Sequence, residues 1–405
     1  MNNNVRQLRV LLNDIPVGRL TLSDGAMCSF HLFDSYRALF PRPVLGQLFE
    51  DDLLKHHRAR TRLPSWFSNL LPEGALRQLV EQQAGGSEFD LLARLGQDLP
   101  GAVRVEEVAA VGAEDDSGEA IDTHEPPSAT MDDAWHFSLA GVQLKFSANR
   151  ADRGMTIPVS GQGGDWILKL PDPRFANVPA NEYATMRWAQ ASGIDIPEID
   201  LVDLSSVSGL PQSGIPRNES QAFVIRRFDR PSTGQRVHME DFAQILDLYP
   251  IDKYRRFNYE TIARVTFELA GSTALKRLVA RLVFMLASGN GDAHHKNWTL
   301  LYPDGLNAEL SPAYDLVSTI QYYPHDGLAL NLGGTKLWTD KRMETFQRMA
   351  RKIGFDEREM REWTIESVAA VRAAWSTASV DFGYEQSARN RIEQHMDTIP
   401  LLQAG

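Results

Sequence analysis

Two polar side chains in the run Gly289 to Trp298, GNGDAHHKNW, are of the types that handle a hydroxyl group and a divalent cation. A carboxylate such as Asp292 can accept a hydroxyl proton, and the amide oxygen of Asn297 can coordinate Mg²⁺. Lys296, which lies between them, could neutralise charge on a transferring phosphoryl group. An apolar, helix-like stretch precedes the run, and the strand-like Trp298 to Leu301 follows it. The pattern indicates a polar loop in which proton transfer and metal binding could occur together.

The spacing of Asp292 and Asn297 matches the D-x-x-x-x-N catalytic loop of protein kinases. The alternative is a structural role, in which the two side chains only cap and turn the chain. A second carboxylate, Asp315, follows in the segment Ser311 to Leu316. Because Mg²⁺ prefers carboxylate and amide oxygens, Asn297 and Asp315 are candidate ligands for one magnesium ion.

Lys169 lies inside the apolar, strand-like segment Trp166 to Leu170. A lysine on a buried strand needs a partner, and Glu182, at the start of the helical segment Tyr183 to Ala191, is the candidate. Protein kinases pair a strand lysine with a helix glutamate in this way. The alternative is an edge-strand lysine whose ammonium group lies in water.

Two further segments carry weaker signals. Ser138 to Lys145 contains one glycine, Gly141, and a lysine that together could cover nucleotide phosphates, although an ordinary hairpin is the alternative. Neighbouring histidines at 294 and 295 would point in opposite directions in an extended loop, and no cysteine or third histidine lies at ligand spacing. A zinc site is therefore disfavoured.

The elements that must position these residues change type along the chain. Alternating apolar residues at Arg9–Leu12 and Val17–Leu22 predict antiparallel strands, and helical spacing follows from Trp66 and at Phe89–Leu95. The remainder begins with strand-like pieces, including Ala222–Ile225, and becomes mainly helical. The predicted helical stretches are 259–286 and 342–392. Strands followed by helices predict an α+β fold.

Composition limits the class of protein. Of 405 residues, 43% are hydrophobic and 23% charged, which is typical of a globular protein. The net charge of −11 disfavours direct, charge-driven binding to nucleic acid or anionic lipid. The single cysteine, Cys28, cannot form an internal disulfide, and no targeting or membrane-spanning segment is visible. We expect a cytoplasmic protein that does not bind membranes.

Residues 111–133 are acidic, contain a Pro-Pro pair and lack both lysine and arginine. Such a segment has little to bury, and it indicates a flexible linker. It divides a first unit of residues 1–110 from a larger remainder.

Taken in order, several short motifs resemble the HipA family of serine/threonine-kinase toxins from type II toxin–antitoxin modules. Each motif is modest, but their number and order make the resemblance strong, and it covers nearly the whole chain. The motifs are Pro64–Gly74, Asp90–Asp98 with Gly101–Val103, Ser138–Lys145, Trp166–Pro171, Asn181–Tyr183, Arg227–Arg230, Glu240–Gln244, Gly291–Asn297 and Ser311–Leu316.

The resemblance implies a bilobal kinase-like domain with an N-terminal α+β subdomain. Residues 134–245 would form the N-lobe, a small mixed sheet with the ATP-binding loop and hinge, and residues 246–405 an all-helical C-lobe with the catalytic loop. The resemblance also implies ATP and Mg²⁺ as cofactors. Family members phosphorylate a serine in their own phosphate loop, and the matching residue here is Ser138.

The resemblance assigns roles to individual positions. Asp292 would be the catalytic base with Lys296 beside it, Asn297 and Asp315 the magnesium ligands, and Glu182 the ion-pair partner of Lys169. Nucleotide contacts are implied for Ala140, Gly141, Val142, Gln143, Leu144, Lys145, Lys169, Arg226, Arg227, Phe228, His294, His295, Lys296, Asn297, Tyr314 and Asp315.

The resemblance further implies a small helix-turn-helix antitoxin like HipB as partner, with DNA contacted mainly through it. The implied substrate is a translation component, such as an aminoacyl-tRNA synthetase, and the implied effect is growth arrest. Two alternatives stay open. One is a small-molecule kinase of related fold, and the other is a nucleotide-binding pseudokinase that acts as a co-repressor.

Overall fold

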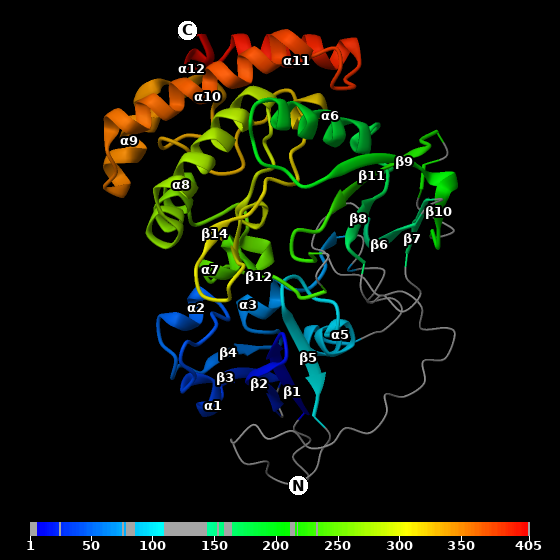
Figure 1. Cartoon of the computed structure of the whole chain (residues 1–405), viewed down its shortest axis with the longest axis vertical. Helices are drawn as coiled ribbons and strands as arrows, with labels where there is room; N and C mark the ends of the chain where they lie inside the picture. Colours follow the sequence, from blue (N-terminus) through cyan, green and yellow to red (C-terminus); the bar gives the residue numbers. More distant parts are fainter. Residues whose placement is uncertain are drawn as a thin grey trace.

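The computed structural model describes residues 6–23, 26–74, 77, 86–108, 144–151, 154–157, 164–210, 215–216, 218–231 and 234–403. Within these residues the chain forms three sheets and a group of long helices. Figure 1 shows the N-terminal sheet at the bottom, a second sheet at the right, and the long helices at the top. The fold is α+β, as the order of strands and helices predicted.

Alternating apolar residues near the N-terminus build an antiparallel sheet with the strand order β4-β3-β2-β1-β5. Leu8 and Val10 of β1 and Leu20 of β2 are fully buried on one face, as a period of two requires. The two predicted strands in this region are confirmed. The strands are β1 (Arg6–Leu12), β2 (Ile15–Ser23), β3 (Met27–Leu32), β4 (His57–Arg60) and β5 (Val103–Glu107).

Short helices pack beside this sheet. The predicted helix at Phe89–Leu95 is α5 (Glu88–Leu95), and it begins at a capping box formed by Ser87 and Asp90. The predicted helix from Trp66 begins with α3 (Ser65–Ser68), and Gly74 and Arg77 are helical as well, while residues 75–76 and 78–85 lie outside the described residues. The other helices here are α1 (Asp34–Arg37) and α2 (Gln47–Glu50).

The second sheet has the strand order β10-β7-β6-β8-β11-β9 and is antiparallel except between β10 and β7. Helix α6 (Val178–Ala191) packs against β11 and β9. The predicted strand Trp166–Leu170 is confirmed as β8 (Trp166–Lys169), and Ala222–Ile225 lies in β11 (Gln221–Arg226). The remaining strands are β6 (Lys145–Ala151), β7 (Gly154–Thr156), β9 (Ile199–Asp203) and β10 (Val207–Ser208).

This second sheet separates two hydrophobic cores. Leu168 and Val224 belong to the core of the N-terminal unit, whereas Phe223 and Ile225 belong to the core of the helical part. Lys169 lies directly opposite Phe223 in the strand register, and therefore on the side of the helical part. Because side chains alternate along a strand, β8 buries Leu168 on one side and directs Lys169 to the other.

The C-terminal part is mainly helical. The predicted helix 259–286 is α8 (Tyr259–Ser288), which is interrupted at Gly271, where φ is 77°. The predicted helical stretch 342–392 consists of α9 (Met343–Ile353), α10 (Glu357–Ala378) and the first half of α11 (Gln386–Asp397). The last described helix is α12 (Pro400–Gln403).

Residues 246–405, expected to be all helical, also contribute two strands to a small sheet, whose third strand comes from residues expected in the N-lobe. Strands β12 (His238–Asp241), β13 (Thr299–Tyr302) and β14 (Glu309–Leu310) pair antiparallel, and α7 (Phe242–Ile245) follows the first of them. The aromatic and apolar run Trp298–Tyr302 favours a strand directly after the polar loop. The sheet therefore holds the end of that loop.

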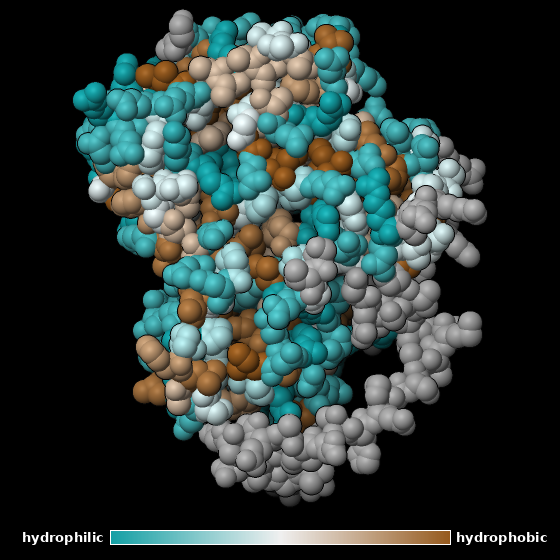
Figure 2. Space-filling view, viewed as in Figure 1, coloured by the Kyte–Doolittle hydropathy of each residue, from teal (hydrophilic) through white to brown (hydrophobic). Residues whose placement is uncertain are grey.

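The face of the molecule in Figure 2 is mainly hydrophilic, and hydrophobic side chains appear on it in separate patches. In the described parts of the chain, no helix has the length and apolarity needed to cross a bilayer.

Candidate active site

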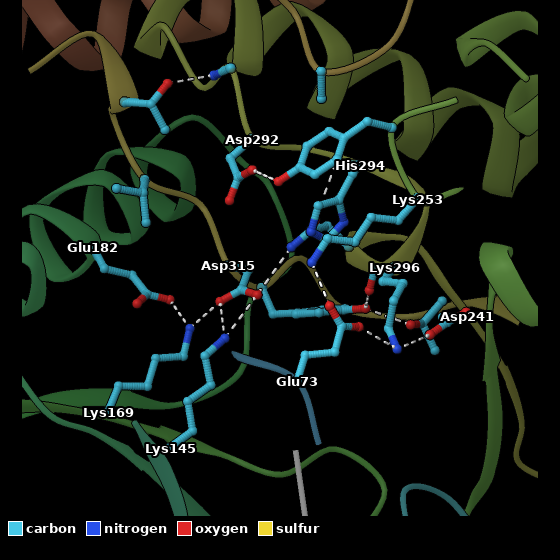
Figure 3. Close-up of a pocket in the computed structure, with 18 of the residues that line it drawn as sticks. Glu73, Lys145, Lys169, Glu182, Asp241, Lys253, Asp292, His294, Lys296 and Asp315 are labelled. Carbon is cyan, nitrogen blue, oxygen red and sulfur yellow. Dashed lines mark hydrogen bonds and ion pairs between the residues drawn. The ribbon is translucent and has the colours of Figure 1, made fainter. Parts of the chain in front are cut away.

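A cavity of about 750 Å³ opens where the N-terminal unit, the second sheet and the helical part meet. This volume lies in the usual range for sites that take a small-molecule ligand. Polar side chains from all three parts line the cavity, and Figure 3 shows how they converge. They include Glu73, Lys145, Lys169, Glu182, Asp241, Lys253, Asp292, His294, Lys296, Asn297 and Asp315.

The loop that carries Asp292 begins where α8 ends. Gly289 has φ 64°, a left-handed conformation that favours glycine, and it turns the chain out of the helix. Asp292 faces the cavity, while Asn297 closes a 3₁₀ turn (His295–Asn297) by accepting a hydrogen bond from the His294 amide (3.2 Å). The helix end and strand β13 thus hold both residues of the D-x-x-x-x-N pattern on one cavity wall.

Asp315 lies in the segment after β14 and adopts a left-handed conformation, with φ 56°. Its carboxylate accepts hydrogen bonds from Lys145 (3.1 Å), Lys169 and the Asn297 amide group (3.0 Å). Burial by itself raises the pKa of this carboxyl, but the two ammonium groups oppose this effect more strongly and hold the pKa well below its usual range. Asp315 is therefore ionised whenever the protein is folded near neutral pH.

Lys169 and Glu182 form a buried ion pair between β8 and α6. Their side chains are 4% and 1% exposed, so the Glu182 charge depends on Lys169 for compensation, while Lys169 also pairs with Asp315. Burial lowers the pKa of Lys169, but Asp315 and Glu182 raise it to a net value above its ordinary one. Desolvation also lowers the pKa of Lys145, which adjoins Asp315 from the next strand, β6.

The donor set suits one Mg²⁺ ion. Asn297 and Asp315 contact each other and line the cavity. In this contact the amide nitrogen of Asn297 faces Asp315 and its amide oxygen accepts from the His294 amide, so binding a cation would require the Asn297 side chain to turn its oxygen toward Asp315. Where the structure describes the chain, no three His, Cys, Asp or Glu side chains form a metal-binding group. A site with one carboxylate fits magnesium bound to a nucleotide, because phosphates and waters supply the remaining oxygens.

Asp292 has a neighbour that the sequence did not reveal. The hydroxyl group of Tyr254 donates a hydrogen bond to the Asp292 carboxylate (2.5 Å), and the tyrosine is 40% exposed. Although Asp292 is open to the cavity, the surrounding walls desolvate its carboxyl and raise its pKa, while the Tyr254 hydrogen bond lowers it in part. A base with a raised pKa is better matched to accepting a hydroxyl proton.

The two histidines of the loop face different surroundings. His294 lines the cavity and packs edge-on against Tyr254 (ring centroids 4.9 Å apart), and desolvation lowers its pKa well below the usual value. His295 is fully buried and donates from Nδ1 to the Lys253 carbonyl (2.7 Å). His295 therefore binds a neighbouring protein segment and does not line the cavity.

Lys296, expected to neutralise a phosphoryl group, has its ammonium group turned toward the N-terminal unit. It donates to the Asn69 carbonyl (2.9 Å) and pairs with Glu73 (2.9 Å). Tyr314 reaches the same turn, because its hydroxyl group donates to the Lys296 carbonyl (2.9 Å).

The segment expected to form the hinge also lines the cavity. Arg226 is partly exposed and pairs with Glu198 (3.5 Å), whereas Arg227 is buried and pairs with Asp98 and Asp229. The Phe228 ring packs against Tyr314 with centroids 5.5 Å apart.

The phosphate-loop positions are only partly described. Leu144 precedes β6, and its carbonyl accepts a hydrogen bond from the Leu170 amide (3.0 Å). The positions outside the described residues are Ser138, Ala140, Gly141, Val142, Gln143 and the expected linker 111–133.

The sequence did not single out Glu73, Lys253 and Tyr254 as site residues. Glu73 belongs to the PEG motif, Pro72–Gly74, at the end of the longer motif Pro64–Gly74 of the N-terminal unit. It pairs with Lys253 (2.6 Å), which lies 180 residues away in the sequence. The motif containing Glu73 was a visible signal, but its partner was not, since no local pattern reports so distant a contact.

Two models of known domains match the chain. The HipA N-terminal domain matches residues 8–106, and the HipA-like C-terminal domain matches residues 137–375. Together the two models cover most of the sequence.

Named relatives agree with these matches. "Putative kinase Y4dM" of Sinorhizobium fredii is 40% identical over 408 residues, covering 98% of each chain. "Putative kinase Y4mE" of the same organism is 30% identical over 73% of this chain and 74% of that protein. "Serine/threonine-protein kinase toxin HipA" of Shewanella oneidensis is 28% identical, over 63% of this chain and 62% of its own length.

Among solved structures, the chain resembles one from the complex of HipA, HipB and operator DNA of Shewanella oneidensis MR-1. The TM-score is 0.68 at 17% identity, over 98% of this chain and 96% of that chain. At this identity the likeness concerns the fold, which is the kinase-like α+β fold expected from the sequence.

Proposed function

The chain belongs to the HipA family, and on this premise we propose that it is an ATP- and Mg²⁺-dependent kinase acting on a seryl or threonyl hydroxyl of a protein. One observation carries the proposal. Asp292, Asn297, Asp315 and Lys169 line a single cavity. Lys169 and Asp315 form an ion pair there, although they are 146 residues apart in the sequence. Catalysis of phosphoryl transfer requires this combination of a base, a metal site and a cation.

In the proposed reaction, the acceptor oxygen bonds to the γ-phosphorus as the bond from that phosphorus to the β,γ-bridging oxygen breaks. ADP leaves with the electron pair, and the acceptor proton passes to Asp292. Lys169 contacts the nucleotide phosphates and Glu182 holds its ammonium group in place. Asn297 and Asp315 would hold Mg²⁺, which would help to neutralise the phosphate charge. The protein therefore contributes mainly position and charge.

When a nucleotide binds, Lys145, Lys169 and Asp315 must change their ionic partners. Lys145 and Lys169 now neutralise Asp315. The phosphate oxygens of a bound triphosphate would pair with both lysines, and a bound cation would neutralise the Asp315 carboxylate in their place. The described part of the phosphate loop, Leu144 and Lys145, and the hinge Arg226–Phe228 line or flank the space for the nucleotide.

The family suggests the wider context, which remains part of the proposal. The domain division is 1–110, 111–133, 134–245 and 246–405, and Ser138 is the site of autophosphorylation. The substrate is an aminoacyl-tRNA synthetase or another translation component. A HipB-like antitoxin supplies most contacts to DNA, which suits a chain of net charge −11.

The test is transfer from γ-labelled ATP with Mg²⁺. We expect label on Ser138 in the wild-type protein and in Asp51→Asn, an exposed carboxylate outside the cavity. Asp292→Asn should lower transfer by about 10²- to 10⁴-fold without loss of fold. Nucleotide binding without any transfer by the wild type would instead identify a pseudokinase, and transfer only to a small molecule would exclude a protein kinase.

A further inference from the structure

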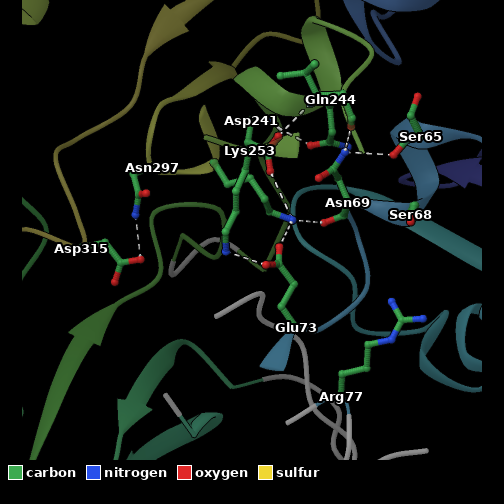
Figure 4. Close-up of polar contacts among 12 residues, drawn as sticks. Ser65, Ser68, Asn69, Glu73, Arg77, Asp241, Gln244, Lys253, Asn297 and Asp315 are labelled. Atoms are coloured by element: carbon green, nitrogen blue, oxygen red, sulfur yellow. Dashed lines mark hydrogen bonds and ion pairs between the residues drawn. The ribbon is translucent and has the colours of Figure 1, made fainter. Parts of the chain in front are cut away.

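The PEG motif of the N-terminal unit reaches the catalytic loop. Glu73 follows α3 by a few residues, and its side chain enters the cavity wall with 14% of its surface exposed. Figure 4 shows this carboxylate beside Lys253, and Figure 3 shows it with both of its lysine partners, Lys253 and Lys296. The N-terminal unit thus supplies a charged group to the site.

Glu73 contacts the catalytic loop directly through Lys296. That lysine lies between Asp292 and Asn297 in the sequence, and its side chain is 5% exposed. It pairs with Glu73 (2.9 Å) and donates to the Asn69 carbonyl (2.9 Å), while Asp241 lies at 3.8 Å. Of these three groups, the Glu73 carboxylate and the Asn69 carbonyl come from the N-terminal unit.

Glu73 contacts the catalytic loop a second time through Lys253, with which it pairs at 2.6 Å. The Lys253 carbonyl accepts hydrogen bonds from the His295 amide (3.2 Å) and from His295 Nδ1 (2.7 Å). The next residue, Tyr254, donates to Asp292 and packs against His294. The segment Lys253–Tyr254 therefore contacts three residues of the loop, Asp292, His294 and His295.

The charge of Glu73 is strongly favoured in this place. Burial opposes its ionisation, but Lys296 and Lys253 more than compensate and lower its pKa to about 2. Without this carboxylate, two ammonium groups would face each other in a poorly solvated space. Their repulsion would separate the segment around Lys253 from the loop around Lys296.

Hydrogen bonds of residues that precede Glu73 in the chain also hold the N-terminal unit against the kinase-like part. The side chain of Asn69 donates to the carbonyls of Ser65 (3.0 Å) and Leu248 (2.7 Å), and Ser65 donates to Asp247. The end of α3 is therefore bonded to the segment that leads to Lys253, which leaves Glu73 little freedom to move.

We propose that Glu73 is a positioning residue for phosphoryl transfer, through which the N-terminal unit holds both sides of the catalytic loop. The inference rests on the proposed kinase function. Glu73 touches neither nucleotide nor acceptor in this account. It fixes Lys296 and Lys253, and through Tyr254 the carboxylate of Asp292.

The test compares Glu73→Gln with Glu88→Gln. Glu88 is a carboxylate of the same unit with 13% exposure, paired with Arg77 and hydrogen-bonded to Leu63 and Ser68, all within that unit. Glu73→Gln should lower kcat by about 10- to 100-fold and change KM for ATP little. Glu88→Gln should leave kcat nearly unchanged. Glu73→Asp keeps the charge and should recover most of the lost rate.

A second measurement does not depend on activity. Amide hydrogen exchange of peptides covering residues 250–258 and 291–298 should be faster in Glu73→Gln than in Glu88→Gln. If the wild type is active and Glu73→Gln and Glu88→Gln have the same kcat, or the same exchange rates in these peptides, the inference is wrong. The proposed kinase function would not be affected by that result. An inactive wild type with the predicted difference in exchange would remove the kinase proposal and support the positioning contact.

Discussion

At the scale of single residues, the site is a set of charges that neutralise one another. The carboxylates of Asp315 and Glu182 lie beside the ammonium groups of Lys169 and Lys145. Two negative and two positive charges therefore form one cluster. Removing any one of them would leave an uncompensated charge, which is costly in a poorly solvated space. The arrangement keeps the groups in place before a nucleotide arrives, at little electrostatic cost.

The Tyr254 hydroxyl group gives a testable pH effect on Asp292. Desolvation raises the pKa of the Asp292 carboxyl, and the Tyr254 hydrogen bond, which stabilises the charged form, lowers it. Transfer needs the ionised carboxylate, so the rate should fall as pH decreases through this pKa. Tyr254→Phe removes the hydrogen bond, raises the pKa, and should move the acid limb of the kcat profile to higher pH.

The measurement is kcat as a function of pH for the wild type and Tyr254→Phe. Tyr323→Phe is the control, because this exposed tyrosine also lines the cavity but packs against Phe175, and within the described residues it makes no hydrogen bond to Asp292. An acid limb that stays in place, or moves to lower pH, would contradict the assignment of Asp292 as the titrating base.

Sequence reasoning at this scale reached the residues that follow one another in short motifs. Asp292 and Asn297 are a local pair, and Lys169 and Glu182 are separated by thirteen residues. The sequence did not identify Glu73 and Tyr254 as site residues, and the reason is physical. Their roles come from contacts with Lys253 and Asp292, and such contacts follow from the packing of distant elements, which composition and spacing do not report.

At the scale of elements, the end of α8 determines where the catalytic loop begins. Gly289 has φ 64°, and its carbonyl accepts hydrogen bonds from Thr319 and Ile320. A Cβ atom at this position would lie 2.6 Å from Ile320 Cδ1, too close for ordinary contact. The left-handed turn and the close packing therefore both require glycine.

Gly289→Ala should destabilise the protein and slow transfer together. The left-handed conformation costs an alanine about 1–2 kcal/mol, and overpacking against Ile320 adds a cost of similar size. Gly193→Ala is the matched control, since Gly193 has φ 79° after α6 and open space where its Cβ would lie. Urea unfolding and kcat should both change more in Gly289→Ala. Equal effects of the two substitutions would mean that the Ile320 contact is unimportant.

Prediction of elements from the sequence worked best where periodicity was strong. The long α8 and the buried strand β8 were both recognised from their apolar patterns. The break at Gly271 within α8 was not, because a single glycine inside a helical pattern is often tolerated. Strand β14, with only two residues, is too short to leave a periodic signal.

At the scale of the whole molecule, the second sheet joins the N-terminal unit to the helical part. One face of the sheet contributes Phe146, Leu168 and Val224 to the core of the N-terminal unit. A buried polar group completes the junction. Asp98 of the N-terminal unit pairs with Arg227 (3.3 Å) and Arg230 (3.1 Å), and Asp229 accepts a hydrogen bond from the Gly101 amide (2.9 Å).

This junction predicts that the described parts unfold together. The side chains of Asp98 and Arg227 are 6% and 1% exposed, so Asp98→Asn would leave buried guanidinium charge without full compensation. We expect the free energy of unfolding to fall by about 3 kcal/mol, with one shared transition in urea. Tryptophan fluorescence and far-ultraviolet circular dichroism should report the same midpoint.

Asp200→Asn is the control for Asp98→Asn, because Asp200 forms an exposed ion pair with Arg150 (2.6 Å), the kind of pair that contributes at most about 1 kcal/mol. If Asp98→Asn instead separated the transition into two steps, the N-terminal unit would fold independently of the kinase-like part. The contact of Glu73 with the catalytic loop would then depend on docking of two stable units. A single transition at lower urea concentration would mean that the loop and the N-terminal unit form one cooperative structure.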